Sequence, residues 1–199
     1  MNLENKNLGV EYETYGLTGK NAMMLNNSLE IFAKLQDESY LITQHRLVKS
    51  DNEIKYIKKA AELADRALEK AWELSHPGED ESNILSAMQG EIFSGGGDYP
   101  GNEFIIGSGP DALLCRYFSG RRKLDPIDQL TLEFAGVYRH YHSALMRTIP
   151  IGKAKKEHIE LHEICFEALK SCESKLKIGN SATPKEEGLN KSTRHSPLP

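Results

Sequence analysis

The sequence predicts an α+β protein in which an antiparallel sheet is covered by helices and is preceded by the end of an α/β unit. Three observations predict this fold class: helical spacing of apolar residues over 50–93, alternating apolar residues over 104–145, and a strand, helix and strand pattern that opens the chain. A length of 199 residues is enough for one full domain with a sizeable core, or for one domain and a piece of another.

The opening segment predicts the last strand, helix and strand of an α/β domain. Short apolar runs at 8–11 and 40–42 flank a helical run around 22–29. A strand begins almost at the first residue, so a parallel sheet here would lack most of its partners. We therefore expect residues 1–48 to be the C-terminal remnant of a larger N-terminal domain and its connector.

Two helices are predicted next. Ser50 followed by Glu53 is a capping box at the start of the first helix, and Pro77 with Gly78 ends it. A second amphipathic run over 84–93 ends at a triple glycine. Each helix has one apolar face, which favours packing on a sheet.

The sheet is predicted over the following residues. A short apolar strand lies at 104–106, and residues 130–134 alternate before a turn near Arg139 and a return strand through Leu145. A last amphipathic helix is predicted over 155–177.

The predicted second domain therefore spans residues 49–179. After Gly179 the chain is polar and has no apolar face, so it cannot repay the entropy of ordering. We expect residues 180–199 to be a disordered tail.

Composition excludes several classes of function. A net charge of −4 gives no broad attraction to nucleic acid or to anionic lipid, so we expect a small polar substrate. No apolar run is long enough for a membrane helix and no signal-peptide pattern opens the chain, which predicts a cytoplasmic protein. Three sparse cysteines without metal-ligand spacing favour reduced core thiols.

Polar residues gather in the predicted hairpin. Alternation points Glu133 away from the apolar side chains beside it, where it is either solvated or part of a site. His140 and His142 are two apart on a presumed strand, which places both rings on one face; hydrogen bonding or substrate contact is favoured over a metal site, because no nearby Asp completes a ligand set. Arg147 binds a substrate carboxylate or pairs within the hairpin.

A basic loop precedes the hairpin. The loop contains Arg116 and the run Arg121, Arg122 and Lys123. We expect these side chains to be solvated rather than to bind an anion.

Three segments resemble one known family. They are RLVKSDNEIKYIKKAAELAD, HPGEDES and IIGSGPDALLCRYFSGRRKLDPIDQLTLEFAG, and they are similar to segments of prolidases, Xaa-Pro aminopeptidases and creatinase. The resemblance runs from about residue 8 to residue 177. It implies a partial pita-bread fold with the first half of the catalytic domain at 49–179, and a homodimer in the full-length form. Family members continue with a second, pseudo-symmetric half, so we expect an incomplete chain.

The resemblance also implies an altered metal site. In the metallopeptidases of the family, one strand carries a metal-bridging Asp and a second Asp stands three residues before the Arg of a TRT-like ending. Those positions hold Glu133 and Ala144 here, and a histidine that precedes a tyrosine is replaced by Arg116 before Tyr117. The resemblance therefore implies no metal cofactor; a divalent metal ion is implied only if the chain is a peptidase.

Within the family, two segments resemble those of the ectoine hydrolases, which open a cyclic amidine. The segments are EFAGVYRHYHSALMRT and ALLCRYFSGRRKL. This implies that Glu133 attacks the amidine carbon or activates water there, with His140 and His142 as proton shuttles or orienting groups. It also implies that Arg116, Tyr117 and Arg147 bind the substrate. The alternatives are a metallopeptidase that cleaves Xaa-Pro dipeptides or acts as an aminopeptidase, and a non-catalytic pita-bread interaction module.

Overall fold

The structure is a computed structural model that describes residues 3–113 and 122–180. It divides into two compact units, Met1–Lys55 and Tyr56–Pro199, which are described separately below. The predicted tail, apart from Asn180, lies outside the described residues. Among the helices that are described, none is long and apolar enough to cross a membrane.

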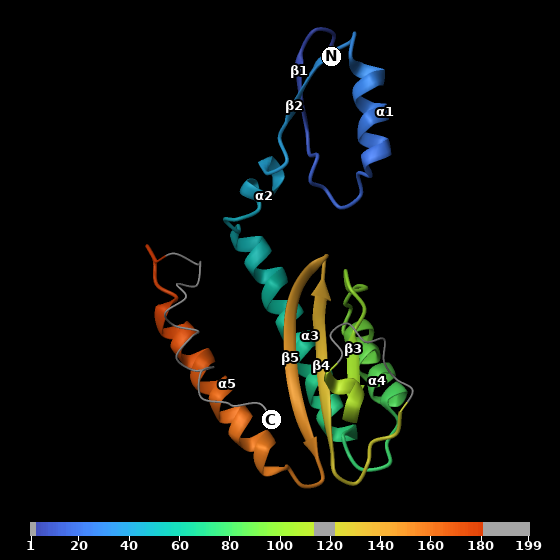
Figure 1. Cartoon of the computed structure of the whole chain (residues 1–199), viewed down its shortest axis with the longest axis vertical. Coiled ribbons are helices and arrows are strands. Elements are labelled where there is room, and N and C mark those ends of the chain that lie inside the picture. Colours follow the sequence, from blue (N-terminus) through green and yellow to red (C-terminus); the bar gives the residue numbers. More distant parts are fainter. Residues whose placement is uncertain (1–2, 114–121, 181–199) are drawn as a thin grey trace. The chain divides into compact units, whose positions relative to one another are not determined.

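The first unit is a strand, helix and strand followed by a short helix. Strand β1 (Asn7–Val10) pairs in parallel with β2 (Lys34–Asp37), and α1 (Gly19–Leu29) connects them (Figure 1). The prediction of an α/β unit is confirmed, but the predicted strand at 40–42 is wrong, because α2 (Leu41–His45) begins there. Strand β2 escaped prediction because Leu35 is its only apolar residue. Strand β2 ends at a turn in which the Asp37 carboxylate accepts a hydrogen bond from the Ser39 amide at 3.0 Å.

Helices α3 (Asp51–Leu74) and α4 (Glu81–Ser94) follow as predicted. The capping box is present: the Ser50 amide donates to the Glu53 carboxylate at 2.6 Å, and the Glu53 amide donates to the Ser50 hydroxyl at 3.4 Å. Asp80 caps α4 by accepting the Ser82 amide at 2.9 Å.

The second unit contains a three-stranded antiparallel sheet. Strand β4 (Asp128–Tyr138) lies in the middle, between β3 (Ile105–Ser108) and β5 (Tyr141–Ile151). A short 3-10 helix, η1 (Gly109–Leu113), follows β3. The register pairs Glu133 with Ile105 on one side and with Met146 on the other.

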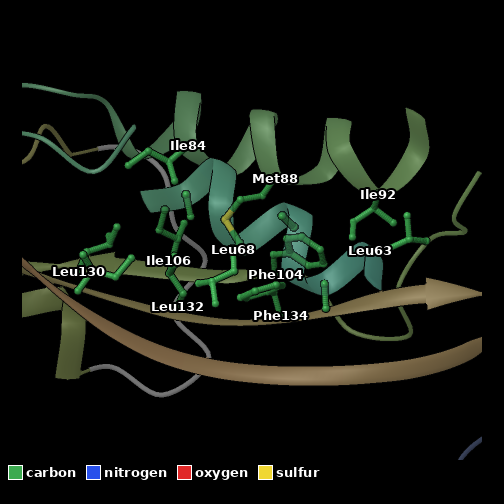
Figure 2. Close-up of a cluster of buried hydrophobic side chains, with 14 of the residues drawn as sticks. Leu63, Leu68, Ile84, Met88, Ile92, Phe104, Ile106, Leu130, Leu132 and Phe134 are labelled. Carbon is green, nitrogen blue, oxygen red and sulfur yellow. The ribbon is translucent and has the colours of Figure 1, made fainter. Parts of the chain in front are cut away.

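One face of this sheet forms the core with α3 and α4. Figure 2 shows Leu68 of α3 and Met88 of α4 in one cluster with Ile106 of β3 and Leu132 of β4. The buried cluster includes Ile84, Met88, Ile92, Phe104, Ile106, Leu130, Leu132 and Phe134. Burial of this alternating face fixes the register of β4, so the other residues of the strand must point to the opposite face. The α+β architecture with helices over an antiparallel sheet is confirmed.

Helix α3 and strand β4 approach each other closely at Gly136. A Cβ atom added there would lie 2.0 Å from the Ala60 carbonyl oxygen and 2.5 Å from the Ala64 nitrogen. Only glycine allows this contact between two backbones. Alanines at the facing positions of α3 complete it.

Helix α5 (Lys156–Lys175) repeats the pattern of α3 but has no buried residue. Each helix is followed by a glycine with positive φ, Gly78 at 86° and Gly179 at 90°. When the helices are aligned on these glycines, all six buried positions of α3 correspond to apolar residues of α5. The buried residues of α3 are Ala60, Leu63, Ala64, Ala67, Leu68 and Ala71, and their counterparts are Leu161, Ile164, Cys165, Ala168, Leu169 and Cys172. Helix α5 therefore carries a face suited to packing on a sheet.

Candidate functional site

Glu133 lies in the middle of β4 on the face opposite the core, as alternation predicts. Its side chain is partly buried, and it makes no hydrogen bond or ion pair with another residue that the structure describes. Glu133 is therefore partly shielded from solvent and unpaired among these residues, so its carboxylate is available to a molecule bound on this face.

Ala144 shares the face of Glu133. Its partner across the hairpin is Ala135, two residues along β4, so Ala144 is the diagonal neighbour of Glu133. Diagonal neighbours on one face of an antiparallel pair lie roughly 7–8 Å apart. The two positions that the resemblance associates with metal-binding aspartates are therefore adjacent in space, and one of them holds a methyl group.

The hairpin turn consists of Arg139 and His140. Both have positive φ, 51° and 64°, so the turn has the left-handed central residues of a two-residue hairpin loop. His140 therefore lies in the turn, and the prediction that it shares a strand face with His142 is wrong. The pattern misled because the turn lacks the usual Asn or Gly.

His142 lies on β5 opposite Val137, on the face of Glu133. Its Nδ1 lies 2.9 Å from the His140 carbonyl oxygen, and its Nε2 accepts the Gly101 amide at 2.9 Å. The His140 amide donates to the Asp98 carboxylate at 3.1 Å. Asp98 and Gly101 were not singled out from the sequence; the glycine-rich stretch before β3 gave no signal of a contact with a hairpin more than thirty residues later.

Arg147 lies across from Leu132, on the face of the sheet opposite Glu133. Its guanidinium is exposed and donates to the Met146 carbonyl at 2.7 Å. Arg116 and Tyr117 lie outside the described residues.

The structure thus brings together only part of the predicted set. Glu133 and His142 share a face. Val137, the partner of His142, lies four positions along β4 from Glu133, which is roughly 13 Å at about 3.3 Å per residue. A proton cannot pass directly between the two side chains over that distance. The catalytic and substrate-binding roles of these residues stay predictions.

The strained turn leads to a first testable expectation. Non-glycine residues in the left-handed region cost about 1 kcal/mol or more each, and both turn contacts of His140 use its backbone. Replacing Arg139→Asn and His140→Gly together should raise the free energy of unfolding by about 1 kcal/mol, because these residues favour this turn and the backbone contacts remain. Urea unfolding of the double variant measures this, and a loss of stability would contradict the turn assignment.

A second polar cluster lies at the other end of β4. The Arg122 guanidinium forms ion pairs with Asp125 and with the buried Asp128, and it donates to the Ser108 hydroxyl at 2.6 Å. That hydroxyl donates to the buried Glu81 carboxylate at 2.6 Å. The expectation of a solvated basic loop is therefore wrong for Arg122, which ties α4, β3 and β4 together.

The charges of this cluster depend on one another. Burial raises the pKa of Asp128, but hydrogen bonds from Arg122 and from the amides of Asp125 and Gln129 outweigh it and hold the pKa below its usual value. The Asp128 hydrogen bond likewise raises the pKa of Arg122. The sequence carries one local signal for this network, the arginine at 122 three residues before the aspartate at 125.

A small pocket of about 190 Å³ lies beside the loop that contacts His142. Gln89 of α4 and the residues Tyr99, Pro100, Gly101, Asn102 and Glu103 line it.

Solved structures share this architecture. The prolidase from Pyrococcus horikoshii matches 85% of the chain with a TM-score of 0.75 and 29% identity, and the chain covers 48% of it. Aminopeptidase PepP from Pseudomonas aeruginosa matches 96% of the chain with a TM-score of 0.81 and 22% identity, covering 45% of that protein. The chain therefore has a partial pita-bread fold, as the resemblance implied.

Sequence comparison identifies the family. The model of metallopeptidase family M24 matches residues 55–185, so the chain belongs to this family of hydrolases. It is 30% identical over 178 residues to an Xaa-Pro dipeptidase from Pyrococcus horikoshii, covering 89% of this chain and 49% of that relative. It is 25% identical over 184 residues to the ectoine hydrolase of Halomonas elongata, covering 87% of this chain and 45% of that relative. The chain spans about half the length of these relatives.

No group of three or more His, Cys, Asp or Glu side chains in residues 3–113 and 122–180 is arranged to hold a metal ion. At the position next to Glu133, the methyl group of Ala144 has no lone pair to donate to a metal.

Proposed function

We propose that this chain belongs to an M24 hydrolase that cleaves a non-peptide C–N bond in a small polar substrate, as an ectoine hydrolase does, without a metal ion. The observation that carries the proposal is the pair formed by Glu133 and Ala144. A carboxylate and a methyl group occupy adjacent positions on one sheet face, so these two positions offer one acid or base group and no pair of bridging ligands.

Glu133 is the reacting carboxylate in this proposal. It accepts a proton from water as the water oxygen adds to the amidine carbon, and it returns that proton to the nitrogen that leaves. The second proton of the water passes from the hydroxyl of the adduct to the released amine as the carbonyl forms. One C–N bond breaks, one C–O bond forms, and the products carry an amide and an amine. Partial burial of Glu133 supports this role, because it removes competing water from the carboxylate.

The other predicted residues take orienting roles. His140 and His142, at the hairpin tip, do not relay protons to Glu133; they hold the backbone of the loop and turn at the end of this face. Arg116 and Tyr117 bind the substrate, with the arginine holding its carboxylate. Arg147 lies on the other face of the sheet, so in this proposal it has no contact with a substrate at Glu133. The proposal includes a homodimer of the full-length form in the cytoplasm. Exposed apolar side chains, such as Leu169 at 55% exposure, support association.

The test compares the complete protein that carries this sequence with its Glu133→Gln variant. Ectoine consumption should fall by at least about 100-fold, because the amide keeps the size of the side chain but cannot accept the proton. Glu163→Gln, on the exposed face of α5, is the matched control and should keep full activity. Equal rates for Glu133→Gln and the unaltered protein would remove Glu133 from the mechanism.

An Xaa-Pro peptidase is the second candidate, and the higher identity to the Pyrococcus horikoshii dipeptidase favours it. Turnover of an Xaa-Pro dipeptide together with a stoichiometric content of Mn, Co or Zn in the purified protein would select it over the first proposal. Turnover of neither substrate would favour a non-catalytic module.

A further inference from the structure

Hydrogen bonds hold the His142 ring in a single tautomer. Its Nδ1 lies 2.9 Å from the His140 carbonyl oxygen, which can only accept a hydrogen bond. Its Nε2 lies 2.9 Å from the Gly101 nitrogen, whose N–H can only donate. The proton must therefore be on Nδ1, and the lone pair of the unprotonated Nε2 accepts the Gly101 N–H. A second proton on Nε2 would face the Gly101 N–H and break that contact.

His142 contacts a loop at its midpoint. The segment Tyr99–Glu103 is anchored at one end by the Asp98 amide, which donates to the Val137 carbonyl at 3.0 Å, and at the other end by Phe104, which is buried. The bond to Gly101 lies between these anchors. This loop lines the pocket of about 190 Å³ and leads directly into β3, where Ile105 pairs with Glu133.

The turn that presents His142 is strained and held by the same contacts. Arg139 and His140 both have positive φ, and the His140 backbone is held on one side by Asp98 and on the other by His142. Strain of this kind persists where tertiary contacts maintain it, and it is concentrated at functional elements.

We propose that His142 is a protonation-controlled latch, which holds the loop Tyr99–Glu103 on the hairpin while the ring is neutral and releases it when the ring takes up a second proton. The titratable or charged side chains on the elements packed at this point are Asp98, Tyr99 and Glu103 on the loop side and Arg139, His140 and Tyr141 on the hairpin. Release loosens one wall of the pocket and the segment before β3, so His142 is a positioning residue that acts through Gly101. This inference does not depend on the reaction proposed above.

The first experiment needs no variant. Nitrogen-15 NMR of the 199-residue chain should show the ring of His142 as the Nδ1–H tautomer at about pH 8. On lowering the pH to about 5, the exchange protection of the Gly101 amide should fall about tenfold relative to its intrinsic rate, the effect of losing one hydrogen bond. The Leu132 amide in the core of β4 is the internal control and should stay protected. A proton on Nε2 at neutral pH, or unchanged Gly101 protection, would overturn the latch.

Two variants separate the contacts of the ring. His142→Gln keeps an acceptor near the position of Nε2, and it should keep Gly101 protected at both pH values because the amide does not titrate. His142→Asn keeps only a donor near Nδ1, and Gly101 should lose protection at both pH values. A role in packing alone would affect the two variants alike, and that result would contradict the proposal.

Discussion

The variant Gly136→Ala should lose about 3 kcal/mol or more of its free energy of unfolding. The added methyl group would lie 2.0 Å from the Ala60 carbonyl oxygen and 2.5 Å from the Ala64 nitrogen. Both are backbone atoms of α3, so the helix must move away from β4 to make room. That movement opens the buried interface next to Gly136. The expected loss of stability therefore lies at the upper end of the roughly 1–3 kcal/mol that overpacking of a core costs.

Chemical unfolding of Gly136→Ala measures this loss, and Gly90→Ala is its matched control. A Cβ atom at Gly90 meets no described atom within 4 Å, and the residue lies inside α4. The control should gain roughly 0.5–1 kcal/mol, since alanine is the better helix former. Equal stability of the two variants would show that α3 and β4 do not approach closely at Gly136.

Replacing Arg122→Met should cost about 3 kcal/mol of stability. The change leaves the carboxylates of Asp128 and Glu81 in the protein without the guanidinium that links them through Ser108. Removing one member of a buried ion pair costs roughly 3–5 kcal/mol, and the lower value applies because the Arg122 side chain keeps 25% of its surface exposed. Lys123→Met, at the adjacent exposed cation, should change stability little.

The same network predicts how stability depends on acid. The pKa of Asp128 is lowered in the folded state, so its contribution is present above the unfolded value of about 3.9 and is lost as the pH falls through the lower folded value. Urea midpoints between about pH 5 and pH 2 should therefore decline in the unaltered chain. The urea midpoint of Arg122→Met should fall less over the same pH range. If it falls as steeply as in the unaltered chain, Arg122 does not stabilise the charged form of Asp128.

Helical spacing and capping residues were sufficient to predict the longer helices α1, α3, α4 and α5, but not the five-residue α2. Ser50 with Glu53 and the glycines after Ser94 mark ends that the structure confirms, because these signals act over a few residues. Strand β2 was misplaced, since a short polar strand is fixed by pairing with β1 rather than by its own composition. Local sequence carries no record of that pairing.

The site was predictable only where it depends on strand alternation. Glu133 was assigned to the correct face, because the buried neighbours Leu132 and Phe134 fix that face. His140 was misplaced because Arg139 and His140 form a turn that is stabilised by Asp98 and His142 rather than by turn-forming residues. The Arg122 network joins Glu81 of α4 to Ser108 of β3 and to Arg122. Patterns within one segment do not show which distant segments come together.

Helix α5 has a consequence for the fate of the molecule in a cell. A helix of 20 residues that buries none of them is marginally stable in water, and this one exposes Leu161, Ile164 and Leu169. Such a stripe is the kind of surface that chaperones bind and that proteases reach when a helix frays. The residues of α5 that match the buried face of α3 are therefore the part of this helix that we expect quality-control proteins to contact first.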